Sequence, residues 1–169
     1  MEKIILKDGE VMFRVKNFYM KKVFDYKGKK LGVVEDLYID FYNSSVLALK
    51  LSKKNFFNKK NSIKVQNIIS IEDDILVKEK DTYNGLLLSD ILGLDIINLH
   101  GNIIGVIEDI IISKENFELK GIVVSTGILD RLIHGKDILV PKECVLGENC
   151  LIHKNDSNIS LRALPKRLE

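Results

Sequence analysis

The chain of 169 residues is 46% hydrophobic and 30% charged, with a mean hydropathy of +0.03, and this composition excludes a disordered or fibrous protein. The net charge of +2 conceals an asymmetry, because residues 1–84 carry 17 Lys/Arg and 12 Asp/Glu, whereas residues 85–169 carry 9 and 12. This basic excess in the first half falls short of a nucleic-acid-binding signature. The two halves could attract each other, or one basic face could serve a partner.

The cysteines and the apolar runs indicate the compartment. Cys144 and Cys150 do not form a Cys-x-x-Cys pair, so the sequence predicts a reduced compartment and no disulfide framework. Charges interrupt the apolar run 4–6, and no apolar stretch approaches the roughly 20 residues of a membrane span. We therefore expect a cytoplasmic protein.

The first half reads as a series of short strands. Asp8-Gly9 lies between the apolar runs 4–6 and 11–13, which is typical of a tight β-hairpin. Further strands are predicted at 20–26, 30–41, 46–51, 62–65 and 75–78. The charged, turn-forming stretch 79–85 is interpreted as a linker.

The second half opens with a short helical turn at 86–93, which Ser89 could cap and Gly93 could end. Strands are predicted at 95–99, 103–112, 119–125, 136–140 and 150–153. Short strands with a turn about every 8 to 12 residues, and no long amphipathic helix, favour small β-barrels or rolls. Residues 156–169 are interpreted as a C-terminal tail, either loose or packed over a short segment.

An internal duplication organises the chain. Residues 18–52 align without a gap with residues 91–125 at a constant offset of 73, with eight identities in 35 positions. The identical pairs are Gly28/Gly101, Gly32/Gly105, Val33/Val106, Glu35/Glu108, Asp36/Asp109, Ile39/Ile112, Asn43/Asn116 and Ser52/Ser125. Each copy would be marginally stable alone, so we expect the two to pack together. The predicted domains are 1–81, 82–155 and the tail 156–169.

The repeated glycines have structural interpretations. Gly28 and Gly101 fall at hairpin turns, where a residue without Cβ takes positive φ at little cost. Gly32 and Gly105 fall inside predicted strands, where glycine marks a bulge or a close backbone approach.

The repeated carboxylates, Glu35-Asp36 and Glu108-Asp109, are the only recurring acid pairs. Adjacent strand residues point to opposite faces, so the members of a pair should not converge on one proton or metal. We interpret Asp36 and Asp109 as capping or solvent-exposed groups. The scattered histidines lack zinc-ligand spacing, the cysteines are interpreted as buried inert thiols, and no nucleotide-binding or nucleophile motif occurs, so we expect no catalytic residue, metal or cofactor.

Two loops differ most between the copies. The first combines lysines with adjacent aromatics and is the predicted partner-binding loop: Lys53, Lys54, Phe56, Phe57, Lys59 and Lys60. The alternative is that one Phe closes the barrel end while the lysines are solvated. The matching loop, 126–135, is apolar and could cover a barrel mouth or form a homodimer contact.

The stretch 27–36, Lys-Gly-Lys-Lys-Leu-Gly-Val-Val-Glu-Asp, resembles the hallmark turn and strand of the PRC-barrel family, and 138–145 is similar to its later Val-Pro element. Members include the cytoplasmic domain of the photosynthetic reaction-centre H subunit, the C-terminal domain of a ribosome-maturation factor and small sporulation-associated proteins. The resemblance implies a small β-barrel adapter without catalytic residues. The first copy departs from the pattern at Gln66, where the second has Pro141, and the offset grows to 75 between Ile63 and Ile138.

The sequence therefore predicts an all-β protein made of two tandem small PRC-type β-barrels packed together, with minor short helical turns. It favours a non-enzymatic adapter or scaffold module for a protein partner. The alternative is a protein that binds RNA or the ribosome through the basic first half and the 53–60 loop. Membrane attachment is disfavoured because no basic amphipathic helix supports it, and homo-oligomerisation stays open.

Overall fold

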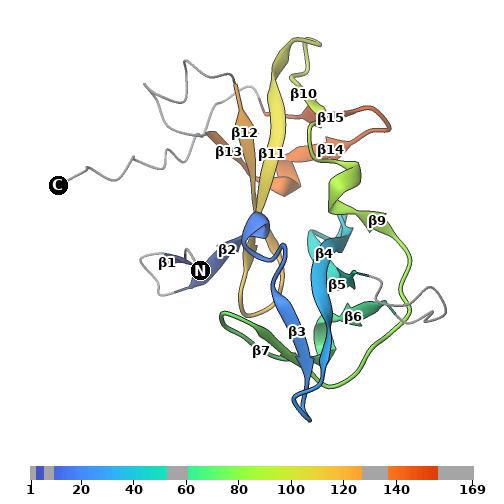
Figure 1. Ribbon diagram of the computed structural model, residues 1–169. Coiled ribbons are helices and arrows are strands. Elements are labelled where there is room, and N and C mark those ends of the chain that lie inside the picture. The colour runs from blue at the N-terminus through green and yellow to red at the C-terminus, as the bar shows by residue number, and fades with distance from the viewer. Residues whose placement is uncertain (1–2, 6–9, 53–60, 127–136, 156–169) are drawn as a thin grey trace.

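The computed structural model describes residues 3–5, 10–52, 61–126 and 137–155 and is all-β in this part of the chain, with short 3-10 turns and no α-helix. This confirms the predicted fold class. Two sheets correspond to the two copies (Figure 1). The 3-10 turns are η1 (Val15–Asn17), η2 (Val65–Asn67), η3 (Leu88–Asp90) and η4 (Pro141–Glu143).

The first sheet is seven-stranded within the described residues, in the order β6-β5-β4-β3-β8-β7, with β9 beside β4. Its strands are β3 (Lys22–Asp25), β4 (Lys30–Asp40), β5 (Ser45–Leu51), β6 (Ser62–Lys64), β7 (Ile68–Ile71), β8 (Ile75–Val77) and β9 (Leu86–Leu87). β3 and β8 run parallel, whereas the other pairs are antiparallel. Within the described chain, β7 forms one edge of this sheet.

The second sheet has eight strands among the described residues, in the order β1-β2-β11-β10-β15-β14, with β12 and β13 extending from β11. Its strands are β1 (Lys3–Ile5), β2 (Val11–Arg14), β10 (Asp95–Ile97), β11 (Ile103–Ser113), β12 (Leu119–Ser125), β13 (Asp137–Leu139), β14 (Cys144–Leu146) and β15 (Cys150–His153). β10 and β15 repeat the parallel pairing of β3 and β8.

The structure adds three short strands that the sequence pattern did not predict: β7, β9 and β14. They are two to four residues long, and β7 and β14 lie at sheet edges, where exposed and half-buried side chains mix without a clear alternation. β1 and β2 form the expected N-terminal hairpin, while its Asp8-Gly9 turn lies outside the described residues.

The segments that lead into the two repeats are exchanged between them. β2, which precedes the first repeat, pairs with β11 of the second, with Arg14 opposite Ile111. β9, which precedes the second repeat, pairs with β4 of the first, with Leu87 opposite Tyr38. Both partners of one pair lie 73 residues from their counterparts in the other, so the exchange obeys an internal twofold relation. Figure 1 shows β2 against β11 and β9 against β4.

Two hairpin turns meet on the twofold relation itself. The amide of Val46 donates to the carbonyl of Phe117 at 2.9 Å, and the amide of Leu119 donates to the carbonyl of Ser44 at 2.8 Å. Ser44 and Phe117 are equivalent positions, and both adopt positive φ, +50° and +59°. The same left-handed conformation in two non-glycine residues indicates that this junction determines the local backbone.

One hydrophobic core spans both repeats. A single cluster of buried side chains includes Phe13 and Phe18 from the N-terminal segment, Leu37 and Leu49 from the first repeat, and Ile110 from the second. The rings of Phe13 and Phe18 meet edge to face, with centroids 5.8 Å apart. Because units of about 75 residues bury too little surface alone, the shared core explains why the repeats are packed together.

Candidate partner-binding site

The repeated aspartates hold the exchanged segments. Asp109 is 3% exposed and accepts hydrogen bonds from Arg14 Nε at 2.8 Å, from the amide of Lys16 at 3.2 Å and from the amide of Ile110 at 2.9 Å. The first two donors belong to the N-terminal segment. A carboxylate with three donors, one of them charged, is well compensated for its burial.

Asp36 does the same for the other exchanged segment. It is 4% exposed and accepts from the hydroxyl of Ser89 at 2.5 Å, from the amide of Ser89 at 3.4 Å and from the amide of Leu37 at 2.7 Å. The prediction that Ser89 is the N-cap of the helical turn is wrong, because Ser89 lies inside η3. The cap is supplied by Asp90, whose Oδ2 accepts the amide of Leu87 at 2.9 Å.

The expectation that adjacent carboxylates face apart is wrong for Glu108 and Asp109. Both bond to Arg14, Glu108 Oε1 at 3.3 Å from Nη2 and Asp109 Oδ2 at 2.8 Å from Nε. The cause is a shift in the pairing register between Ile107 and Asp109, which breaks the strict alternation of the strand. The group they share is a structural cation.

Tyr19 lies close to both aspartates. Burial, followed by the charges of Asp36 and Asp109, raises the pKa of Tyr19 to about 12. Its phenol therefore stays protonated at neutral pH. The aspartates and Tyr19 form a structural junction, and the donors already occupy the carboxylate oxygens.

The repeated glycines lie where the backbone bends. Gly28 and Gly101 have φ of +78° and +79° at the tips of equivalent hairpins. Gly32 and Gly105 lie beside register shifts between β3 and β4 and between β10 and β11. A Cβ on Gly105 would come within 2.4 Å of Val124 Cγ1, whereas one on Gly32 would meet Leu51 at 3.4 Å.

The thiols and the polar clusters do not form a metal site in the described residues, where no group of three His, Cys, Asp or Glu side chains is arranged to hold an ion. Cys144 is buried as expected, and burial together with the charge of Glu143 raises its pKa to about 12. Cys150 is only half-buried, which differs from the expectation of two buried thiols. The helical segments among the described residues are too short to cross a membrane.

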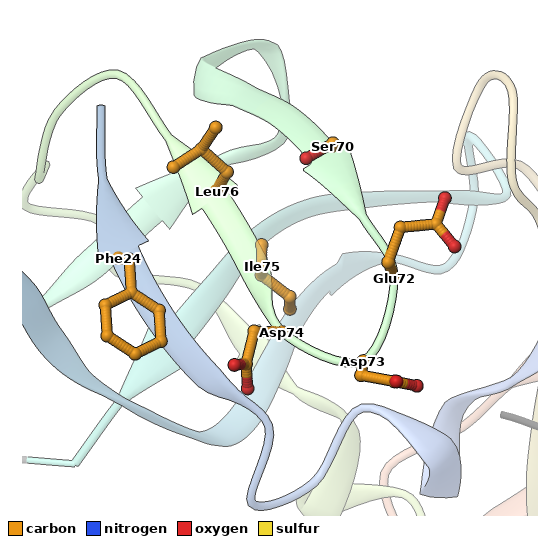
Figure 2. Close-up of a pocket in the computed structure, with 7 residues that line it drawn as sticks. All are labelled: Phe24, Ser70, Glu72, Asp73, Asp74, Ile75 and Leu76. Atoms are coloured by element: carbon orange, nitrogen blue, oxygen red, sulfur yellow. The ribbon is translucent and has the colours of Figure 1, made fainter. Parts of the chain in front are cut away.

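A pocket on the outer face of the first sheet, named here the outer groove, is formed by Phe24, Leu76 and Ser70 on three neighbouring strands. Leu76 pairs with both Phe24 and Ser70, so the three side chains form a row across β3, β8 and β7. Their strand neighbours Val23 and Ile75 are fully buried, which directs Phe24 and Leu76 outward. The pocket has a volume of about 390 Å³ and is lined also by Ile75 and by the turn after β7 (Figure 2).

That turn, the acidic turn, carries Glu72, Asp73 and Asp74, all three exposed beside the groove. The ammonium of Lys21 holds it by donating to the carbonyls of Glu72 and Asp73 at 2.6 and 2.7 Å. Lys114 of the second repeat contacts the Glu72 carboxylate at 3.3 Å. Within the described residues, Asp73 and Asp74 form no ion pair, so their charges face solvent at the end of an apolar floor.

The equivalent face of the second sheet differs. Ile152 pairs with Ile97 and with Val145, giving an all-aliphatic row in place of Phe24, Leu76 and Ser70. The corresponding turn, 147–149, contains one carboxylate, Glu148, instead of three. The outer faces thus share their architecture and differ in size, polarity and charge.

The hairpin tips differ as well. Four exposed residues of the first repeat, named the basic tip, are Tyr26, Lys27, Lys29 and Lys30. Tyr26 is 64% exposed, and Lys27 Nζ lies 5.4 Å from its ring centre. The second repeat has neutral residues at these positions: Leu99, His100, Asn102 and Ile103.

The predicted partner-binding residues of the 53–60 loop, Lys53 to Lys60, lie outside the described residues, as do residues 127–135 of the apolar loop. The sequence analysis missed the outer groove, because Ile68–Ile71 was not recognised as a strand. Three consecutive carboxylates between apolar runs were the available signal.

Two small β-structures in tandem, joined by exchanged segments and with open outer faces, define a duplicated β-barrel protein rather than an enzyme with a converging polar pocket. The chain belongs to the PRC-barrel domain family, whose model matches residues 10–82 and again residues 84–154. Domains of this family are generally non-catalytic. A comparison with curated proteins found no match.

Proposed function

We propose that this protein is a non-enzymatic adapter for a protein partner and that the outer groove of the first repeat is its contact surface. The observation that carries the proposal is an apolar floor, Phe24 and Leu76, that lies open to solvent on the outside of a sheet whose other face forms the core. Concave apolar sites with a few polar groups at the rim are typical binding surfaces. The generally non-catalytic character of the family supports a binding role.

The test is affinity capture of the tagged full-length protein from a native lysate, with and without nuclease. The wild type is compared with Leu76→Asp, which places a charge on the groove floor, and with Ile152→Asp, the same substitution at the equivalent position of the second repeat. The proposal expects a defined protein that survives nuclease, is lost with Leu76→Asp and is kept with Ile152→Asp. Thermal unfolding of both variants verifies that each is folded.

The 53–60 loop stays a prediction that the same capture addresses. Phe56→Ala/Phe57→Ala loses the partner if these aromatics contribute to the contact. Retention of the partner in this variant and in Leu76→Asp, or turnover of a substrate by the purified protein, contradicts the proposal.

The second candidate function is RNA or ribosome binding, and the basic tip is the observation that favours it. An exposed aromatic beside three lysines combines a stacking surface with phosphate-binding charges. This function expects an affinity for single-stranded RNA that falls steeply with salt, by a slope of about −0.7 per phosphate contact. Tyr26→Ala/Lys29→Ala should weaken it, and binding that is absent or independent of salt removes the candidate.

A further inference from the structure

We infer that the outer groove takes an extended segment of a partner protein that carries an apolar side chain flanked by lysine or arginine. This inference rests on the proposed adapter function and names the chemistry of the segment that is bound. Charge complementarity is the argument: an apolar floor ends at three exposed carboxylates, Glu72, Asp73 and Asp74.

The floor selects the apolar side chain. Phe24 and Leu76 are half-buried and lie side by side, with Ser70 completing the row. Serine is small, so this end of the row leaves room that Val145 fills in the second repeat. One large aliphatic or aromatic side chain in this pocket removes the apolar floor from water.

The acidic turn selects the flanking cations. Lys21 bonds to the carbonyls of the turn, which fixes its position without neutralising the carboxylates of Asp73 and Asp74. Lys22, exposed on β3, forms no ion pair among the described residues. A lysine or arginine one or two residues from the apolar side chain lies within reach of these carboxylates, because successive residues of an extended chain advance by about 3.3 Å.

The experiment is selection of a random 12-residue peptide library, displayed on phage, against the full-length protein. The affinities of the enriched peptides are then measured for the wild type, for Asp73→Asn/Asp74→Asn and for Glu148→Gln. The first variant removes two exposed charges that have no ion-pair partner in the described part of the chain, and leaves Glu72 with Lys114. Glu148→Gln is the matched change in the equivalent turn of the second repeat.

The expected result is enrichment of peptides with an apolar residue flanked by Lys or Arg. Their affinity should fall at least tenfold in Asp73→Asn/Asp74→Asn, fall with rising salt, and stay unchanged in Glu148→Gln. Amide chemical-shift changes in the wild type should centre on β3, β7 and β8.

Three results overturn the inference. Enriched peptides that map to the groove but lack basic residues, or that bind Asp73→Asn/Asp74→Asn equally, overturn the cationic chemistry and leave the adapter function standing. Peptides that map elsewhere overturn the groove as the site of this contact. Self-association of the wild type that disappears in Asp73→Asn/Asp74→Asn identifies a second copy as the occupant. Failure of the adapter function itself is a separate result, the absence of a nuclease-resistant partner in the capture experiment.

Discussion

The two repeats are alike where they hold each other and different where they face solvent. Asp36 and Asp109 bond to amides 73 residues apart, and the exchanged strands have equivalent registers. The outer groove with its acidic turn and the basic tip are absent from the corresponding faces of the second repeat. The comparison teaches that the shared residues maintain the architecture, while the first repeat's outward surfaces are the place to look for function.

The junction also contains one asymmetry. Arg14 pairs with Glu108 and Asp109, but its counterpart in the first repeat is Leu87, so Asp36 relies on the Ser89 hydroxyl and Glu35 remains exposed. The two halves of the junction should therefore differ in their sensitivity to substitution.

Loss of Asp109 should have the largest effect. Asp109→Ala leaves Arg14 and two amides without this acceptor, and we expect a loss of about 3 kcal/mol in the free energy of unfolding. Asp36→Ala leaves neutral donors only and should cost about 2 kcal/mol. Urea unfolding of both variants measures the difference, and a greater loss for Asp36→Ala would contradict the asymmetry.

The glycines provide the next comparison. Gly105 has φ of +155°, and an added Cβ would lie 2.9 Å from the carbonyl oxygen of Ser125, so Gly105→Ala should destabilise by about 2 kcal/mol. Gly32→Ala meets only ordinary contacts of 3.4 Å and should change stability by less than about 1 kcal/mol. Thermal unfolding tests the pair, and equal shifts would show that the two bends are not as different as their geometry indicates.

The smallest effect concerns Tyr19 and appears only at alkaline pH. Its pKa in the folded protein, about 12, lies above the ordinary value of 10.0, so the folded state binds the phenolic proton more tightly. The resulting stabilisation is present below pH 10 and is lost as the pH rises toward 12. Tyr19→Phe should reduce the decline in unfolding free energy between pH 9.5 and 11.5, and an identical decline in both proteins would exclude this contribution.

The sequence was sufficient for the fold because its signals are local. Glycines at turns and apolar runs 73 residues apart predict two β-barrels without knowledge of long-range pairing. The exchange of β2 and β9 could not be predicted, since strands of two to four residues carry no information about which distant strand they join. The role of Asp109 was hidden for the same reason, because its partner Arg14 is 95 residues away.

The outer groove was missed for a different physical reason. Glu72, Asp73 and Asp74 are plain in the sequence, but their meaning depends on Phe24, which the parallel pairing of β3 with β8 places beside Leu76. A face composed of three separate strands has no local sequence pattern. The predicted 53–60 loop was instead visible because its lysines and aromatics are contiguous.

The most direct test of the central claim, that the partner contacts the first repeat and not the second, is site-specific photo-cross-linking in native lysate. A photoreactive phenylalanine is placed at Ser70 on the groove or at Val145, which occupies the equivalent position in the second repeat. The account predicts a defined protein adduct from position 70 that persists after nuclease treatment and none from position 145. An adduct from position 145 alone, or equal adducts from both positions, would contradict it.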